Sequence, residues 1–305
     1  MKAEDRADLH VHTTASDGTM TPDRVVRIAR HIGLAAVGIA DHDTDAGIAE
    51  ALRTGDCLGI EVIPALEINT DVDNREIHVL GYMVWPVPAR LSGILEKMRE
   101  VRRGRLDEMV RRLNALGVNI TAARVREIAG GSVIGRPHVA RAMVEAGCVR
   151  SIEEAFEIYL DIGRPCYVER YKISPEDAVR ELAMAGGIPV LAHPASAGRD
   201  DLIPGLVKAG LMGIEVYHPD HDRGDEQRYL RIAEREGLLV TGGSDSHGED
   251  ERGPTIGRIT VPYATVLEMK EIKARMEYPG GLPDKIDSGA TKPRGGSGGA
   301  AETHD

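Results

Sequence analysis

The chain has 305 residues, the length of two average domains or of one barrel-sized domain with an insertion. Its 42% hydrophobic and 29% charged residues allow a large packed core and exclude a wholly disordered chain. The net charge of -11 argues against a nucleic-acid coat protein, because binding to a phosphate backbone needs Lys and Arg. With neither a membrane-length apolar stretch nor a signal peptide's apolar segment, we expect no membrane segment and a cytoplasmic location.

Short apolar segments alternate with amphipathic ones, a pattern typical of βα units around a parallel sheet. We predict strands at 7–13, 36–40, 60–68, 76–84, 188–192, 213–217, 238–241 and 256–261. After the first strand, Thr21 is predicted as the N-cap and Pro22 as the first residue of a helix that ends near Ile32. Seven or so parallel strands suggest an α/β barrel.

Between 88 and about 170 the pattern changes to helices without intervening strands. Apolar residues at three- and four-residue spacings predict helices at 91–116, 122–128, 136–146 and 151–162. We therefore divide the chain into a first barrel part (1–88), a helical insertion (89–170), a second barrel part (171–278) and a disordered tail (279–305).

The insertion is basic although the chain is acidic. From Arg90 to Arg141 there are twelve Lys or Arg against five Asp or Glu, a net charge of +7 that leaves -18 for the rest. A basic block on an acidic body could attract a small anionic ligand. Alternatively, these arginines form a solvated helix face, and the sequence leaves both interpretations open.

His10 and His12 form a His-x-His pair inside the first predicted strand. Residues i and i+2 of a strand project from the same face about 7 Å apart, so both imidazoles could reach one metal ion. The alternative, two exposed histidines at a sheet edge, fits poorly with the apolar residues that alternate with them.

Similar polar residues follow or close most other predicted strands. They are Asp41, His42, Asp43, Glu67, His78, His193, His218, Asp245 and His247. Any one of them could be a hydrogen-bonded core histidine or a capping carboxylate. Because active sites of parallel barrels lie at the carboxyl ends of the strands, their joint placement predicts one site there.

These residues carry a resemblance to a known family. The chain resembles the PHP (polymerase and histidinol phosphatase) family in Asp8-Leu9-His10-Val11-His12-Thr13, Ser16-Asp17-Gly18, Asp41-His42-Asp43, His193-Pro194 and Asp245-Ser246-His247. The likeness spans roughly residues 5 to 265, and the insertion with Gly135-Arg136-Pro137-His138 is similar to the branch that acts on nucleotides and short oligonucleotides. It implies a distorted (β/α)7 TIM-like barrel with an inserted α-helical subdomain and a three-metal centre.

The resemblance also implies the metal ligands. His10 and His12 would hold the first metal with Glu67 and Asp245; Glu67 would bridge to a second metal held by His78 and His193; and Asp17, His42 and His247 would hold the third. Nitrogen and oxygen ligands suit Mn(II), Fe(II) or Zn(II), and we favour Mn(II). Three carboxylates and three divalent cations give the filled site a charge of about +3, which favours phosphate binding.

Other residues are candidates for binding, proton transfer or positioning. His218 is a candidate general acid or a residue that supports the ligands, and Asp43 and Asp8 are expected to orient metal-bound imidazoles. Arg136 and His138 are candidate substrate-binding residues, although their segment could simply start a helix. His221 is expected on the surface.

The leading hypothesis is a metal-dependent phosphoesterase that acts through a metal-bridging hydroxide. It would remove the 3'-phosphate of nucleoside 3',5'-bisphosphates or trim short RNA from its 5' end. The alternatives are a histidinol-phosphate phosphatase and a non-catalytic metal-binding regulatory module. We expect a small phosphorylated substrate as the partner, with no membrane, no long duplex nucleic acid and no protein partner.

Overall fold

The structure, a computed structural model, describes residues 6–73, 75–129, 135–168 and 173–277. The predicted tail and the predicted end of the insertion at 170 lie outside the described residues. The strands are β1 (Arg6–Val11), β2 (Ala36–Ile39), β3 (Glu61–Val72), β4 (Arg75–Tyr82), β5 (Ile188–Leu191), β6 (Gly213–Tyr217), β7 (Leu239–Gly242), β8 (Glu249–Asp250), β9 (Gly253–Pro254) and β10 (Val261–Pro262). The helices are α1 (Pro22–His31), α2 (Ile48–Leu58), α3 (Ala89–Ala115), α4 (Ala122–Ala129), α5 (Arg136–Glu145), α6 (Ile152–Ala155), η2 (Phe156–Leu160), α7 (Pro175–Met184), α8 (Pro194–Ala197), η3 (Asp200–Leu202), α9 (Ile203–Ala209), α10 (Arg223–Glu236) and α11 (Ala264–Glu277).

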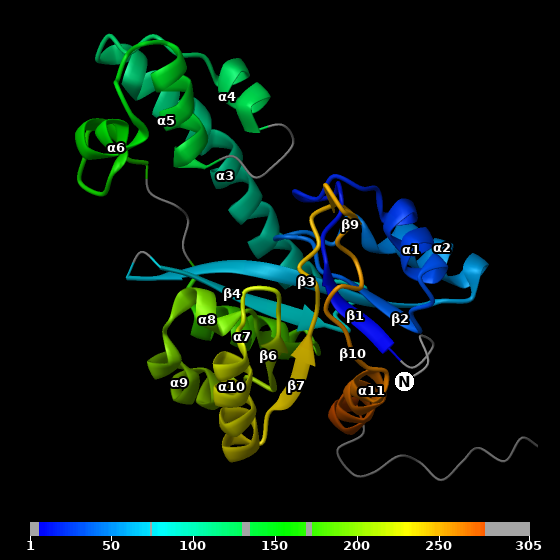
Figure 1. The fold of residues 1–305 in the computed structure, drawn as a ribbon. Coiled ribbons are helices and arrows are strands. Elements are labelled where there is room, and N and C mark those ends of the chain that lie inside the picture. Colours follow the sequence, from blue (N-terminus) through cyan, green and yellow to red (C-terminus); the bar gives the residue numbers. More distant parts are fainter. Residues whose placement is uncertain (1–5, 74, 130–134, 169–172, 278–305) are drawn as a thin grey trace, which may run out of the picture.

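Eight strands form one curved sheet in the order β10-β1-β2-β3-β4-β5-β6-β7 (Figure 1). The neighbours β1–β2, β2–β3, β5–β6 and β6–β7 pair in parallel. Beyond β1, the N–H of His12 donates a hydrogen bond to the carbonyl of Ser246, which follows β7, at 2.9 Å. This contact brings the first and last long strands together, so the predicted α/β barrel is confirmed as a nearly closed sheet.

The expectation of parallel strands throughout is wrong for β4, which pairs antiparallel with both β3 and β5. Only two residues separate β3 from β4, whereas a parallel pair needs a crossover of about a dozen residues. β3 also continues to Val72, beyond its predicted end, so β3 and β4 form a long hairpin. The last predicted strand, 256–261, is reduced to the short β10, which pairs antiparallel with β1.

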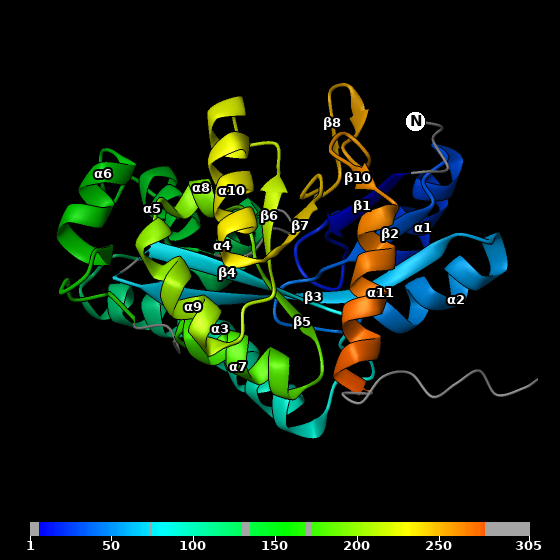
Figure 2. The ribbon, with the colours of Figure 1, turned by 90° about the horizontal axis from the view of Figure 1, so that it is seen from below.

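Helices cover the outside of the sheet (Figures 1 and 2). α1 begins as predicted, because the Thr21 hydroxyl accepts a hydrogen bond from the N–H of Arg24 at 3.3 Å. Its residues Val25 and Val26 pack in one cluster with residues of β2 and α2. Tight strand packing also explains Gly38 in β2, where a Cβ atom would lie 2.3 Å from the carbonyl oxygen of Leu9.

The predicted helices of the insertion are all present in its described part, as α3, α4, α5 and the continuous pair α6–η2. They share an apolar cluster of their own, which includes Leu106, Leu113 and Val139. The first turns of α3 instead pack into the barrel's cluster through Leu91 and Leu95. α3 therefore joins the two parts, as Figure 1 shows, while the division into domains stays a prediction.

Among the helices that the structure describes, we find none that is both long and apolar enough to cross a membrane. The longest of them, α3, has 27 residues and carries charged side chains along its whole length.

Candidate metal centre

The nine predicted metal ligands come from six strands or the loops that follow them. His10 lies in β1, Glu67 in β3 and His78 in β4; His12 and Asp17 follow β1, His42 follows β2, His193 follows β5, and Asp245 and His247 follow β7. His78 lies near the start of its strand, but β4 runs antiparallel and so places this residue beside the carboxyl ends of its neighbours. The structure thus brings all nine residues to one end of the barrel.

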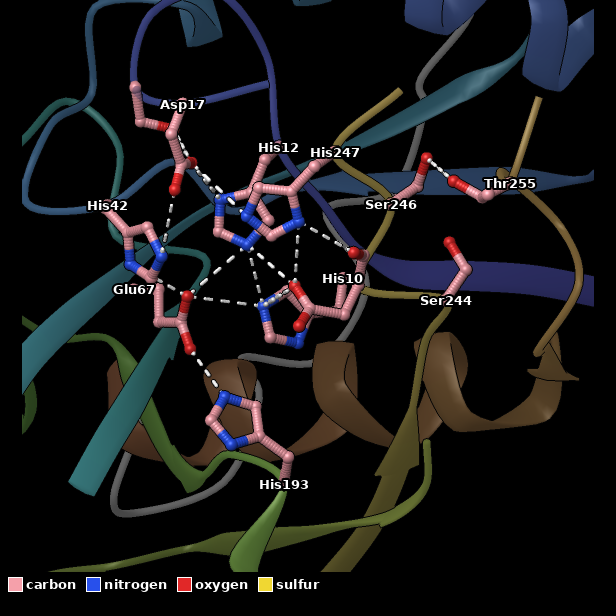
Figure 3. A network of polar contacts seen from close by, with 12 residues as sticks. His10, His12, Asp17, His42, Glu67, His193, Ser244, Ser246, His247 and Thr255 are labelled. Atoms are coloured by element: carbon pink, nitrogen blue, oxygen red, sulfur yellow. Dashed lines mark hydrogen bonds and ion pairs between the residues drawn. The ribbon is translucent and has the colours of Figure 1, made fainter. Parts of the chain in front are cut away.

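Glu67 is the centre of this cluster (Figure 3). Its side chain is 1% exposed, and its Oε1 lies 2.9 Å from Nδ1 of His78 and 3.1 Å from Nε2 of His193. Its other oxygen, Oε2, lies 3.0 Å from Nδ1 of His42 and 3.4 Å from Nε2 of His10. One carboxylate therefore faces imidazoles on two sides, the arrangement expected of a ligand that bridges two cations.

Four atoms, Oε2 of Glu67 and three atoms of neighbouring side chains, lie at distances that suit a single ion. Nε2 of His10 and Nε2 of His12 are 3.1 Å apart. Oδ1 of Asp245 lies 3.4 Å from the first and 3.0 Å from the second of these nitrogens. Ligand atoms that are about 2.0 to 2.2 Å from one metal lie about 3.0 to 3.6 Å from each other, so these positions match the predicted first site.

Asp17 organises a second face of the cluster, on the loop after β1. Its Oδ2 lies 3.7 Å from Nε2 of His42, and its Oδ1 lies 3.3 Å from Nε2 of His247. The ring of His12 also approaches, with Nδ1 3.6 Å from Oδ1 of Asp17. These four residues form a group that could hold a metal ion, in agreement with the predicted third site.

Several buried atoms of the cluster face one another as ion pairs but lack the geometry of a hydrogen bond among the described residues. They are Nδ1 of His12, Nδ1 of His42, Oε2 of Glu67, Nε2 of His78 and Oδ1 of Asp245. A buried polar atom left without a partner costs about 1–3 kcal/mol, so a fold rarely keeps several of them together. Divalent cations would satisfy these atoms, and the residues present therefore fit a multi-metal centre.

The charges of the cluster support one another. Burial raises the pKa of Glu67, but the neighbouring His42 and His78 outweigh burial and hold this pKa well below its usual range. Burial lowers the pKa of His42, yet Glu67 and Asp17 raise it overall, to about 9. The carboxylate of Glu67 and the imidazole of His42 thus favour each other's charged forms, whereas the pKa values of His12 and His78 are lowered, chiefly by burial. A cation would bind to the deprotonated ligands of this set.

Three residues of the site have strained backbones. Asp43, His193 and Asp245 have positive φ angles of 52°, 24° and 47°, a region that non-glycine residues seldom adopt. Such strain costs about 1–3 kcal/mol for each residue and persists only where the surroundings hold it. Among the described residues, three of the five non-glycine residues with positive φ follow β2, β5 and β7 at this end of the barrel, the others being Asp73 and Met83, which supports a functional role for this end.

His218, the candidate general acid, lies in the site beside Asp245. Its Nδ1 accepts a hydrogen bond from the N–H of Asp220 at 3.2 Å, and its Nε2 lies 3.3 Å from Oδ2 of Asp245. Because Nδ1 acts as the acceptor, the proton of the neutral ring lies on Nε2 and faces the cluster. His221, which was expected on the surface, is instead buried, and its Nδ1 donates to the carbonyl of Val216 at 2.8 Å.

Asp43 and Asp8 support the site through the backbone. Asp43 accepts hydrogen bonds from the backbone and side-chain nitrogens of Asn69 at 3.0 Å each. It also lies near enough to His42 to help raise that residue's pKa. Asp8 accepts the N–H and hydroxyl of Ser244 at 2.9 and 2.6 Å, which fixes the chain just before Asp245, while burial raises the pKa of Asp8 to about 6.

Arg136 and His138 both have contacts within the insertion. The guanidinium of Arg136 donates to the carbonyl of Leu160 at 3.2 Å and lies 5.5 and 5.4 Å from the ring centres of Phe156 and Tyr167. Nδ1 of His138 accepts a hydrogen bond from the N–H of the residue that caps α5, at 3.1 Å. These residues do begin a helix, and their substrate-binding role stays a prediction.

Much of the basic block is paired with carboxylates. In the described part of the insertion these pairs are Arg90 with Glu181, Arg99 with Glu96, Arg111 and Arg112 with Glu108, Arg124 with Glu127 and Glu145, and Arg126 with Asp107. The solvated helix face therefore accounts for these arginines. Arg99 has a second contact, a 2.7 Å hydrogen bond from Nη1 to the carbonyl of Asp43, which ties α3 to the loop of the metal centre.

Two further buried carboxylates support the site: Asp41, which the sequence placed at a strand end without a role of its own, and Glu215, which the sequence interpretation missed. Asp41 accepts hydrogen bonds from the N–H and hydroxyl of Thr13 at 2.8 Å each and from the Ser16 hydroxyl at 2.6 Å, which shapes the loop that carries Asp17. Glu215 in β6 is fully buried and contacts His10. A signal for Glu215 was present, because it is the one charged residue in the otherwise apolar predicted strand 213–217.

Comparison with known proteins agrees with this geometry. The family model described as PHP domain matches residues 8–123, which include six of the nine clustered residues. The 3',5'-nucleoside bisphosphate phosphatase of Chromobacterium violaceum is 33% identical over 279 residues, which are 89% of this chain and 98% of that protein. The chain belongs to the PHP family. Like other PHP proteins, it is a metal-dependent phosphoesterase.

Other PHP relatives differ in the reactions for which they are named. The phosphoribosyl 1,2-cyclic phosphate 1,2-diphosphodiesterase of Eggerthella lenta is 33% identical, with 82% of this chain and 97% of that protein covered. The 5'-3' exoribonuclease Rnm of Escherichia coli is 31% identical, with 79% and 84% covered. A solved protein from Bifidobacterium adolescentis, which is assigned to the metal-dependent phosphoesterases, is 33% identical, with a TM-score of 0.69 and 86% and 94% covered. The relatives thus share phosphoester hydrolysis in their names but differ in substrate, and the substrate needs a separate argument.

Proposed function

We propose that this protein hydrolyses phosphate esters of nucleotides, with a nucleoside 3',5'-bisphosphate as the first candidate substrate and short 5'-phosphorylated RNA as the second. The observation that carries the proposal is the convergence of nine imidazole and carboxylate side chains, with Glu67 in contact with several of the imidazoles. The names of the relatives support the substrate class. The three free cysteines fit the reducing cytoplasm, where such substrates occur.

The proposed ligand set is the one that the sequence predicts. His10, His12, Asp245 and Glu67 would hold one ion, with Glu67 shared with a second ion. Mn(II) is our first choice because the ligands are imidazole nitrogens and carboxylate oxygens without a thiolate. When bound, the ions supply an activated water and charge stabilisation for the phosphoryl group.

The exposed side of the cluster supports one direction of substrate entry. Side chains of His10, His12 and Glu67 are at most 1% exposed, whereas those of Asp245 and His247 are 25% and 39% exposed. A hollow of about 410 Å³, lined in part by Asp245 and His247, adjoins this side. A phosphoester would therefore approach over Asp245 and His247, with His218 beside it to hold or deliver a proton through Nε2.

One experiment tests the proposal directly. Purified protein is assayed for bound metal and then for phosphate release from a 3',5'-bisphosphonucleotide, mononucleotides and histidinol phosphate. On short 5'-phosphorylated RNA and a ribose 1,2-cyclic phosphate, the released nucleotides and the ring-opened products are measured by chromatography. We expect the bisphosphonucleotide to give the highest kcat/KM. A preference for histidinol phosphate would overturn the nucleotide assignment, and metal binding without turnover on any substrate would favour the regulatory-module alternative.

His218→Asn tests the proton-transfer role. We expect kcat to fall by roughly 100-fold or more, because general acid–base groups contribute about 10²–10⁴-fold, while metal content stays at the wild-type level. The pH profile of kcat should also lose one limb. The variant should keep more of its activity on a substrate whose leaving group is more acidic. Loss of bound metal in this variant would show instead that His218 acts only by positioning Asp245.

Arg136→Ala tests the substrate-binding role of the insertion. We expect a KM increase of about tenfold with kcat nearly unchanged, as for a residue that binds substrate and transition state equally. Arg124→Ala, which removes another paired arginine of the insertion, serves as the control and should leave KM unchanged. A fall in kcat as large as the rise in KM would contradict the binding role. It would indicate that the contacts of Arg136 with Phe156 and Tyr167 hold the structure of the insertion instead.

A further inference from the structure

Glu215 lies beneath the metal centre and is completely buried in β6. A buried carboxylate needs hydrogen-bond donors, because a buried polar group without partners is costly. Among the described residues, the hydrogen-bond donors to Glu215 both belong to candidate metal ligands.

The first donor is the ring of His10. Its Nδ1 lies 3.0 Å from Oε1 and 3.3 Å from Oε2 of Glu215. Both carboxylate oxygens face Nδ1, and Oε2 already accepts a backbone N–H, so Glu215 is the acceptor and Nδ1 of His10 is the donor. The lone pair of the neutral ring is then on Nε2, the atom that faces Glu67 and Asp245 at 3.4 Å each.

The second donor is the backbone of His193. Its N–H donates to Oε2 of Glu215 at 2.9 Å. His193 has the strained backbone angles φ 24° and ψ 59°, and this hydrogen bond is a contact that holds them. The strained turn directs the ring toward Glu67, with Nε2 of His193 3.1 Å from Oε1.

We propose that Glu215 is a positioning residue that prepares two metal ligands at once, by fixing the ring of His10 and the backbone of His193. The proposal deepens the proposed function and rests on it. His10 belongs to the first candidate site and His193 to the second. Glu215 therefore contacts a ligand of each site, and Glu67 contacts the same two ligands directly. Carboxylates that orient metal-bound histidines typically change metal affinity by about 10- to 100-fold.

Glu215→Gln is the sharpest test because it keeps the shape and removes the charge. Its amide has one acceptor oxygen for two donors, so one contact must become a clash between N–H groups. We expect Mn(II) affinity, measured by calorimetry on metal-stripped protein, to fall about 10- to 100-fold. Glu61→Gln is the matched control, because Glu61 lies in β3 and accepts hydrogen bonds from Tyr263 and Lys270, away from the metal centre.

The outcomes distinguish a failure of the positioning role of Glu215 from a failure of the proposed function. A weaker metal affinity in Glu215→Gln alone, with a folded metal-free protein, supports the positioning role. Equal Mn(II) affinities in Glu215→Gln and the wild type, or an equal loss in Glu61→Gln, would overturn it and leave the proposed function standing. If the wild type bound no Mn(II), the proposed function would fail as well.

A measurement on the wild type keeps the test valid if Glu215→Gln does not fold. In the zinc-loaded protein with ¹⁵N-labelled histidine, the His10 ring should show a proton on Nδ1 and metal bound at Nε2. The signal is assigned by its loss in His10→Asn. A metal-bound Nδ1 or a proton on Nε2 would overturn the role given to Glu215.

Discussion

Glu67→Ala is expected to lower kcat/KM by at least about 1,000-fold, roughly 4 kcal/mol of transition-state stabilisation. The reason is geometric, because its two oxygens face His78 and His193 on one side and His10 and His42 on the other. Among the described residues, the ligands at the edge of the cluster contact fewer of the candidate ligands, so we expect smaller effects from their loss. Metal content per chain should fall in parallel, and elemental analysis of the purified variant measures it.

The control for Glu67→Ala is Glu61→Ala, which changes the same residue type at the first position of the same strand, away from the metal centre. Glu61 contacts Tyr263 and Lys270, so its loss should affect stability and leave metal content at the wild-type level. Far-ultraviolet circular dichroism checks that both variants are folded. Wild-type activity in Glu67→Ala would contradict the bridging role and with it the proposed arrangement of ions.

Removal of metal is expected to abolish activity and to destabilise the fold. At a free metal concentration of about 1,000 times Kd, binding contributes about 4 kcal/mol to the free energy of unfolding, and a chelator removes that contribution. The free energy of unfolding of the barrel should fall because bound cations stand in for hydrogen-bond partners of Nδ1 of His12, Nε2 of His78 and other buried atoms. Without the cations, these buried atoms lose that interaction. Thermal unfolding with and without EDTA, followed by added Mn(II), measures both the loss and its recovery.

The same chelator scan on Glu67→Ala provides an internal control. If the shift in Tm arises from the proposed centre, it should shrink in that variant, because little metal remains to be removed. A full wild-type shift in Glu67→Ala would place the stabilising ion elsewhere. An unchanged Tm in the wild type, with activity intact after chelation, would contradict a metal-dependent reaction.

The sequence predicted those parts of the structure that rest on local pattern. Apolar segments and helix caps such as Thr21 and Pro22 are read from neighbouring residues, so most element positions agreed with the structure. The direction of β4 was missed because a strand's apolar pattern is the same whichever way it runs. The short connection between β3 and β4 held that information.

The residues of the metal centre were predictable because imidazoles and carboxylates are unusual in or directly after apolar strands. His10 and His12, which alternate with apolar residues in and after β1, are an example. Their supporting partners were harder to find. Glu215 contacts His10 across 205 positions of sequence, and Asp8 contacts Ser244 across 236. Such contacts depend on the closed barrel, which no local pattern encodes.

α3 has a mechanical consequence for the insertion. At about 1.5 Å per residue, its 27 residues span about 40 Å, with Leu91 and Leu95 anchored in the barrel and Leu113 in the insertion's core. A rod of this length converts each degree of tilt at its base into about 0.7 Å of travel at its tip. Arg99 lies partway along α3 and donates a hydrogen bond to the carbonyl of Asp43. Any tilt of α3 would therefore act directly on the loop that carries His42.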